Sequence, residues 1–342
     1  MALRPPHCMA FSKTSSSLPL QTQLFAAIRA QAPAHLSLAD EIADVLGLST
    51  DSAYRRLRGE TALSLDEAGR LAQHFNIALH DLLGGPRFAV AFQRVSINAL
   101  PQGLAEYLAI TREYFEQAAR GREKSGAYAA KDIPAFYHFL FPELARFKLF
   151  FWLKTIKAAE AYQSLSFAPR HIPDELVAAG AAAARQYLSL PLTEIWNDET
   201  ANSTLGQIEY YHQAGLYEQP TDAQRLLDEV EALIRHIQHQ AVRGATLRDG
   251  AEQAPYQLYY NEILLLDNTI FTVADGLSRV LLTYNGMDYL QTSDAEFCGE
   301  VQHWLRVQTE KSTLISRVSE KERNRFFNKM YARIDEQRRR LR

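Results

Sequence analysis

Three arginines, Arg55, Arg56 and Arg58, lie within four consecutive positions of the stretch "GLSTDSAYRRLRGE". A guanidinium group is always charged and presents a planar set of donors, so it can bind a phosphate or the edge of a base with two hydrogen bonds. The chain as a whole is not basic, because its 342 residues carry a formal charge of −3. Any contact with nucleic acid must therefore come from a local patch such as this one.

The residues around the arginines predict the helix that presents them. Ser49 can begin it, because its hydroxyl can accept a hydrogen bond from a free backbone N–H one turn later. Ala53 and Leu57 are four positions apart and share one face, which can pack against a preceding helix. Such a helix has the geometry of a recognition helix in a major groove. The residues predicted to contact DNA are Ser49, Thr50, Asp51, Ser52, Tyr54, Arg55, Arg56 and Arg58.

Two kinds of contact are expected along this helix. Residues 50–52, Tyr54 and Arg55 are predicted to face the groove, and Arg56 and Arg58 to lie nearer the phosphates. The alternative is that Arg55 and Arg58 are solvated, with Asp51 and Arg55 forming an ion pair of about 0.3 kcal/mol. Tyr54 can reach a phosphate or pack on the helix, and Thr50 and Ser52 can read bases or only serve the helix start.

The flanking segments predict a small helical domain around this helix. Helical spacing of apolar residues runs through residues 20–32, 37–46, 49–58 and 64–75, and "ALHDLLGG" adds a last short helix. Ser37 with Asp40 and Ser64 with Glu67 have the spacing of helix caps. Gly47 suits the tight turn between the second and third helices. The sequence therefore predicts five short helices between Leu20 and Leu83, after a disordered tail over residues 1–19.

The segment "IADVLGLSTDSAYRRLRGE", followed by "LSLDEAGRLAQHFNIALHDLL", resembles the Cro/repressor-type (XRE) helix-turn-helix family. The matching features are Ile42-Ala43, Gly47-Leu48-Ser49, Arg58-Gly59 and the run from Leu71 to Leu83. The resemblance covers about one fifth of the chain. It implies a five-helix, lambda-repressor-like domain over residues 20–85 that binds double-stranded DNA, often as a dimer on a palindromic site.

Two features depart from that family. It usually has an apolar residue where this chain has Arg56, so the choice between Arg55 and Arg56 as the base reader stays open. Residues 20–85 also contain eight acidic residues against five arginines, which weakens the attraction to phosphates. Dimerisation can compensate, as can the basic segment "RIDEQRRRLR" (residues 333–342), although such a run is usually a solvated helix end.

Residues 88–342 predict a large α+β domain, so the chain as a whole is mainly α with a smaller β portion. Asp267-Asn268, Asp275-Gly276 and Asn285-Gly286 interrupt β-rich runs between Tyr256 and Thr292. These residue pairs tolerate positive φ and predict hairpin turns of an antiparallel meander. The aromatic stretch from Phe136 to Trp152 permits a ligand pocket, although an ordinary core is the favoured interpretation.

Enzymatic chemistry is not indicated, and no cofactor or metal is expected. His236 and His239 could lie side by side on a helix, but no third ligand has suitable spacing. Cys298 and His303 are five apart, which is not one helical face, so a buried structural cysteine is favoured. The run "AAGAAAA" (residues 178–184) favours close helix packing over a phosphate-binding loop.

These features together predict a sequence-specific DNA-binding transcriptional regulator. The C-terminal domain is expected to form a homodimer and could bind a small-molecule effector. A cytoplasmic location without membrane contact is expected, because no apolar run of about 18 residues occurs and the two cysteines are far apart. The alternative is a protein-interaction or antitoxin-like module whose helix-turn-helix regulates only its own gene. A third and weaker hypothesis is that the C-terminal domain is an enzyme.

Overall fold

The computed structural model describes residues 19–31, 37–75, 77, 79, 90–97, 103–262 and 266–341. The chain divides into two compact units, residues 1–91 and 92–342, and each is considered by itself. Apart from Pro19, the tail predicted over residues 1–19 lies outside the described residues. The same holds for the fifth helix predicted to end at Leu83, of which only Leu79 is described.

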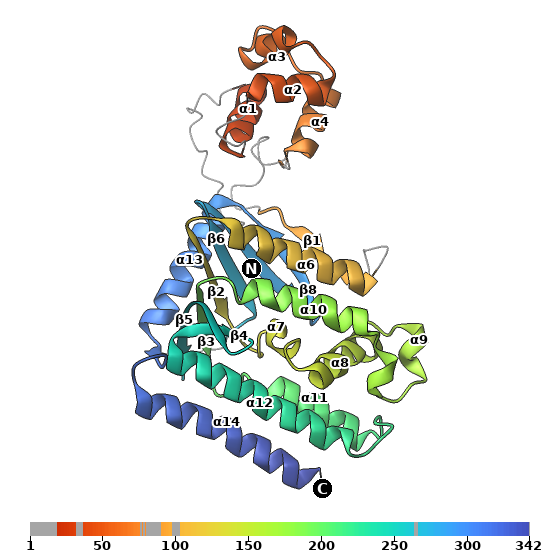
Figure 1. Ribbon diagram of the computed structural model, residues 1–342. Coiled ribbons are helices and arrows are strands. Elements are labelled where there is room, and N and C mark those ends of the chain that lie inside the picture. Colours follow the sequence, from red (N-terminus) through yellow and green to blue (C-terminus); the bar gives the residue numbers. More distant parts are fainter. Residues whose placement is uncertain are drawn as a thin grey trace, which may run out of the picture. The chain divides into compact units, whose positions relative to one another are not determined.

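The N-terminal unit contains the helices α1 (Leu20–Gln31), α2 (Leu38–Leu46), α3 (Thr50–Leu57) and α4 (Leu65–His74), shown in Figure 1. Gly47 ends α2 in the left-handed conformation, with φ of 69°, as its position in the turn predicts. Ser37 differs from its prediction as a side-chain cap. Its carbonyl, rather than its hydroxyl, accepts the N–H groups of Asp40 and Glu41. The core consists of Leu24, Phe25, Ile28, Ile42, Ala43, Leu46, Ala53 and Leu71.

A nine-stranded mixed sheet forms the centre of the C-terminal unit (Figure 1). Its strands lie in the order β1-β8-β7-β6-β2-β3-β5-β4, with β9 beside β5. β2, β3 and β5 are parallel neighbours, and the other pairs are antiparallel. The strands are β1 (Gln93–Val95), β2 (Lys124–Ala129), β3 (Leu192–Trp196), β4 (Ala245–Arg248), β5 (Ala251–Tyr260), β6 (Thr269–Ala274), β7 (Leu277–Tyr284), β8 (Asp288–Thr292) and β9 (Thr313–Leu314).

The region predicted as a meander contains two antiparallel connections and one departure. Asp275-Gly276 joins β6 to β7, and Asn285-Gly286 lies between β7 and β8, all four residues with positive φ. β5 does not continue this series, because it lies beside β3, with β2 and β3 between it and β6. Asn268 accordingly makes no hairpin turn, and its side-chain amide donates to the carboxylate of Asp132.

Helices cover the two faces of the sheet unequally. α13 (Ala295–Glu310) packs against Ala129, Ile195 and Phe271 on one face. The other face carries the larger core, and α14 lies beside α12 there. Its helices are α6 (Gly103–Arg120), α7 (Ala135–His138), α8 (Pro142–Phe151), the π-helix η2 (Trp152–Ile156), α9 (Glu160–Gln163), the 3₁₀ helix η3 (Pro169–His171), α10 (Asp174–Tyr187), α11 (Asn202–Gln213), α12 (Asp222–Arg243) and α14 (Glu320–Arg340).

The small residues of α10 allow close packing, as the run "AAGAAAA" predicts. Gly180 lies directly against Phe139, whose ring would be 2.1 Å from an added Cβ atom. Any larger residue there must displace that ring. Among the helices that the structure describes, none is long and apolar enough to cross a membrane.

A fully buried carboxylate lies in the larger core. Side chains alternate along β3, so that Leu192, Glu194 and Trp196 face the helices while Ile195 faces α13. Glu194 is 0% exposed. Its Oε1 accepts from the hydroxyls of Tyr137 (2.9 Å) and Tyr187 (2.5 Å). Its Oε2 accepts from the Trp196 indole and the Tyr256 hydroxyl, both at 2.9 Å. Four donors therefore satisfy a charge that has no access to water.

Candidate nucleic-acid interface

α2 and α3 form a helix-turn-helix around the turn at Gly47. Ala53 is completely buried and allows α3 to approach the core closely. Ser49 caps α3, since its hydroxyl accepts from the N–H of Ser52, as predicted. Thr50 donates from its hydroxyl to the carboxylate of Asp40 on α2 at 3.1 Å. The start of α3 is thus fixed both by its own cap and by α2.

The outer face of α3 carries most of the side chains predicted to contact DNA. Asp51, Tyr54, Arg55 and Arg58 are exposed, as are Ser49 and Thr50 just before them. Tyr54 is 48% exposed. Ser52 is half-buried, and its hydroxyl accepts from that of Ser49 at 3.0 Å. The structure therefore assigns Ser52 a contact in the helix start and leaves Tyr54 and Arg55 turned toward solvent.

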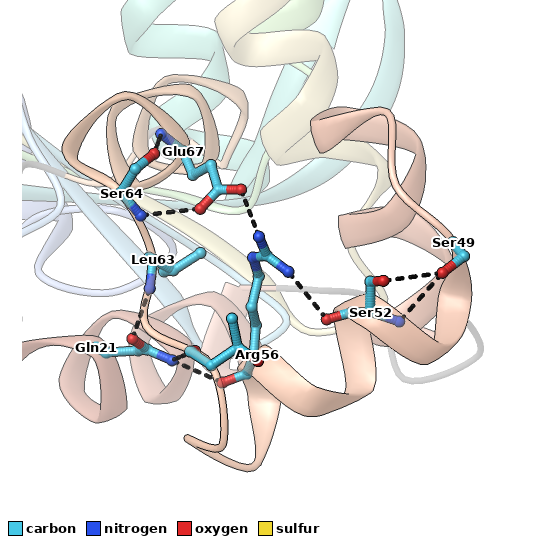
Figure 2. A network of polar contacts seen from close by, with 8 residues as sticks. Gln21, Ser49, Ser52, Arg56, Leu63, Ser64 and Glu67 are labelled. Carbon is cyan, nitrogen blue, oxygen red and sulfur yellow. Dashed lines mark hydrogen bonds and ion pairs between the residues drawn. The ribbon is translucent and has the colours of Figure 1, made fainter.

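Arg56 differs from the other predicted contacts, because its guanidinium points into the domain (Figure 2). Nη2 donates to Oε1 of Glu67 on α4 at 2.8 Å, and Nη1 donates to the carbonyl of Ser52 at 3.3 Å. The Arg56 and Glu67 side chains are only 15% and 14% exposed. A group held in this way is not placed to bind a phosphate. Of the two arginines left open as base readers, only Arg55 faces outward.

Glu67 connects α3 to the start of α4. Its Oε2 accepts from the N–H of Ser64 at 2.8 Å, and the Ser64 hydroxyl accepts from the N–H of Glu67 at 3.1 Å, which confirms the predicted capping box. The Ser64 N–H and, to a smaller extent, Arg56 hold the pKa of Glu67 below its usual value. One carboxylate thus serves both the cap of α4 and the ion pair with α3.

Gln21 of α1 fixes the segment that leaves α3 (Figure 2). Its amide nitrogen donates to the carbonyls of Arg56 (2.8 Å) and Thr61 (2.9 Å), and its amide oxygen accepts from the N–H of Leu63 at 2.9 Å. Sequence reasoning did not single out Gln21, because its partners lie 35 to 42 residues away. Together with Glu67, Gln21 holds the end of α3 in place.

Glu60 faces the two outward arginines. Its carboxylate lies 3.0 Å from Nε of Arg58 and 3.9 Å from Nε of Arg55. All three side chains are exposed, so each pair contributes little to stability. A carboxylate in this position competes with any other anion for the two guanidinium groups. The sequence offers one signal for this ion pair, because Glu60 follows Arg58 by only two positions.

Replacing Glu60 by glutamine is expected to tighten binding to double-stranded DNA about threefold to tenfold at low salt, because Arg55 and Arg58 lose a competing carboxylate. Fluorescence anisotropy of a labelled duplex at several salt concentrations measures the affinity. Asp44→Asn is the matched control, since Asp44 is exposed on α2 and the structure describes no ion pair between it and α3. Equal affinities for the Glu60 and Asp44 variants would contradict this role of Glu60.

The other candidates from the sequence take structural positions. At the basic end of α14, Arg338 pairs with Asp228 and Glu231, and Arg340 pairs with Glu336 and Glu209, so both arginines are engaged within their own unit. Burial lowers the pKa of His236 to about 4. Cys298 is buried, and burial raises the pKa of its thiol. Within the described part of the chain, no cluster of three or more His, Cys, Asp or Glu residues could hold a metal ion.

Comparison with known families supports a helix-turn-helix domain in this part of the chain. Residues 22–90 match the family model of the BetR domain, a DNA-binding domain of the helix-turn-helix type. This match supports the helix-turn-helix class, while membership of the XRE family stays a prediction. Searches of curated proteins and of solved structures found no significant match. The N-terminal unit is thus similar to a BetR domain, and the chain carries a helix-turn-helix DNA-binding domain.

Proposed function

We propose that this chain is a sequence-specific transcriptional regulator that places α3 in the major groove of double-stranded DNA. The observation that carries the proposal is the two-sidedness of α3. Ala53 and Arg56 hold the helix to its own domain, whereas Tyr54, Arg55 and Arg58 are exposed. A recognition helix needs this arrangement, because one side must be rigidly supported while the other reaches the bases.

The position of each residue along α3 decides whether its proposed contact is with a base or with a phosphate. The first turn, with Thr50 and Asp51, and the next outward residue, Arg55, lie where a recognition helix meets base edges. A guanidinium bound to guanine gives the strongest discrimination of these side chains. Arg58, at the end of α3, is the proposed phosphate contact. Arg56 orients the helix instead of touching DNA.

Dimerisation is part of the proposal, because one domain offers few free charges. Each N-terminal unit presents Arg55 and Arg58, so a homodimer brings four such arginines to a palindromic site. Because Arg55 is assigned to a base, the phosphate contacts of the dimer are the two Arg58 side chains, which correspond to a slope of about −2 in log K against log salt. The C-terminal unit is the proposed dimerisation element.

Selection of bound DNA from a random pool, with the full-length protein at defined salt, tests the proposal, and an enriched palindrome is expected. Absence of any enriched sequence would favour the interaction-module alternative.

Arg55→Ala is then expected to weaken binding to the selected operator by about 1–3 kcal/mol and to relax specificity at one position. Arg29→Ala is the control, since it removes an equal charge from an exposed position on α1. Unchanged operator affinity in the Arg55 variant would refute its role.

A further inference from the structure

The C-terminal unit contains a cavity of about 130 Å³ between α6, α7, α8, α11 and the beginning of β8. Its walls are largely aromatic and include Tyr107, Phe136, Phe139 and Trp152. A cavity of about 150 Å³ is large enough to hold benzene. The space therefore suits a compound with a single ring or a short chain.

Lys148 of α8 brings a positive charge into this wall. The residue is 5% exposed, and its ammonium donates to Oε1 of Gln207 at 2.6 Å and lies 3.5 Å from the hydroxyl of Thr204. Neither partner is charged. Among the described ion pairs of the chain none involves Lys148. Asp132, in the same wall, attracts the Lys148 ammonium only through its charge, and its carboxylate accepts a hydrogen bond from Asn268. A buried ammonium that no carboxylate contacts directly is costly and is often functional.

The neighbouring hydrogen bonds are oriented toward this ammonium. Nδ1 of His138 lies 3.3 Å from the carbonyl of Ala135, which can only accept, so Nδ1 carries the proton. Nε2 of His138 then accepts from the Thr204 hydroxyl at 3.0 Å, which leaves the Thr204 oxygen free to accept from Lys148. Burial and Lys148 hold the pKa of His138 far below its usual value, so the imidazole stays neutral. An ammonium has three N–H groups, and these partners occupy two of them.

We propose that this cavity binds a small organic monocarboxylate, whose carboxylate accepts from Lys148 and whose flat apolar body lies among Phe136, Phe139 and Trp152. The regulatory meaning of this site rests on the proposed function, since the ligand would be the effector of the regulator. Binding itself requires no DNA. If the protein selects an operator but binds no carboxylate, only the proposed ligand site is wrong, and the proposed function is unaffected.

Titration calorimetry of the full-length protein at pH 7 tests the proposal, with benzoate, 2-furoate and butyrate as acids and benzamide as the neutral match for benzoate. At least one acid is expected to bind, and benzoate at least about thirtyfold tighter than benzamide, because only a carboxylate pairs with the ammonium. The Lys148→Met variant is expected to bind benzoate about thirtyfold more weakly than the wild-type protein does. Lys321→Met, which removes an exposed lysine of α14, is the control. Failure of all three acids, or equal binding of benzoate and benzamide, overturns the proposal.

The pH dependence provides a test that needs no variant. Burial lowers the pKa of Lys148 to about 8. A bound carboxylate favours the charged ammonium, so affinity should be level below pH 7 and fall about tenfold per pH unit above pH 8. The other titratable groups in the cavity wall are His138 on α7, Asp132 after β2, Tyr107 on α6, Tyr128 on β2 and Tyr289 on β8. The tyrosines have pKa values raised by burial, so they stay neutral in this range. An affinity that is constant from pH 7 to 9.5 contradicts the role of Lys148.

Discussion

Replacing Arg56 by alanine is expected to destabilise the N-terminal unit by about 2–4 kcal/mol. The change removes the partner of Glu67 and of the Ser52 carbonyl, in a position where the Arg56 side chain is only 15% exposed. It also removes a hydrocarbon stem that is largely buried. A loss of this size is a large fraction of the stability of a small domain. We therefore expect α3 and α4 to open far more often than in the wild-type protein.

Hydrogen–deuterium exchange in the full-length chain measures this effect. Backbone amides of α3 and α4 should lose protection, whereas β3 and β5 should keep theirs. All three tryptophans, Trp152, Trp196 and Trp304, lie in the C-terminal unit, so their fluorescence reports that this unit stays folded. Unchanged protection of α3 in the Arg56 variant would show that the ion pair with Glu67 is dispensable.

Glu67→Gln separates the ion pair from the cap of α4. Glutamine can still accept the Ser64 N–H in a capping box, but it carries no charge for Arg56. The pKa of Glu67 is lowered in the folded protein, chiefly by the Ser64 N–H and then by Arg56. The charge therefore stabilises the fold at neutral pH, and this contribution disappears as the pH falls through the lowered pKa. The stability difference between wild type and the Gln variant should vanish in acid.

The contrast between Arg55 and Arg56 shows what spacing alone can predict at the site. Ala53 and Leu57 define the inner face of α3, and Arg56 is three positions after Ala53, so helical geometry places it on that side. The residue type favours an exposed position instead, because most arginines are exposed and a buried arginine needs a partner. That partner, Glu67, lies 11 residues later on a separate helix. Only the packing of α4 against α3 brings the two together.

The fold of the C-terminal unit shows a similar limit. Local turn chemistry places Asp275-Gly276 and Asn285-Gly286 correctly between strands, because positive φ is a property of the residues themselves. The position of β5 has no such local signal. Its neighbour β3 ends 55 residues before β5 begins at Ala251, with α11, α12 and β4 in between. Parallel pairing through long crossovers is decided by how the helices cover the sheet.

The aromatic stretch from Phe136 to Trp152 contributes both to the core and to the wall of a cavity. Phe147, Leu149 and Phe150 are completely buried in the core, whereas Phe136 and Trp152 line the cavity. The feature that distinguishes the cavity wall from a plain core is Lys148, the one lysine in the largely apolar segment "RFKLFFW". Its buried position could not be derived from the sequence, because lysine in a helix is usually exposed.

Glu194→Ala is expected to destabilise the C-terminal unit by about 4–6 kcal/mol, more than any other single change considered for this unit. The substitution leaves the hydroxyls of Tyr137, Tyr187 and Tyr256 and the indole N–H of Trp196 without their acceptor in a site that water does not reach. Each buried donor without a partner costs about 1–3 kcal/mol, although the hydroxyls can recover part of this by turning toward one another. Urea unfolding of this unit, followed by the fluorescence of its three tryptophans, measures the loss.

Glu194→Gln distinguishes the hydrogen bonds from the packing of the side chain. The amide oxygen can accept from Trp196, which can only donate, and the amide nitrogen can then donate to the hydroxyls of Tyr137 and Tyr187, which can also accept. The Gln variant should therefore retain most of the stability that the Ala variant loses. Burial raises the pKa of Glu194, which means that the buried charge itself opposes folding. Removing this charge offsets part of the cost of the rearranged hydrogen bonds in the Gln variant. If the two variants are equally unstable, the four donors need the carboxylate specifically, and a neutral acceptor does not suffice.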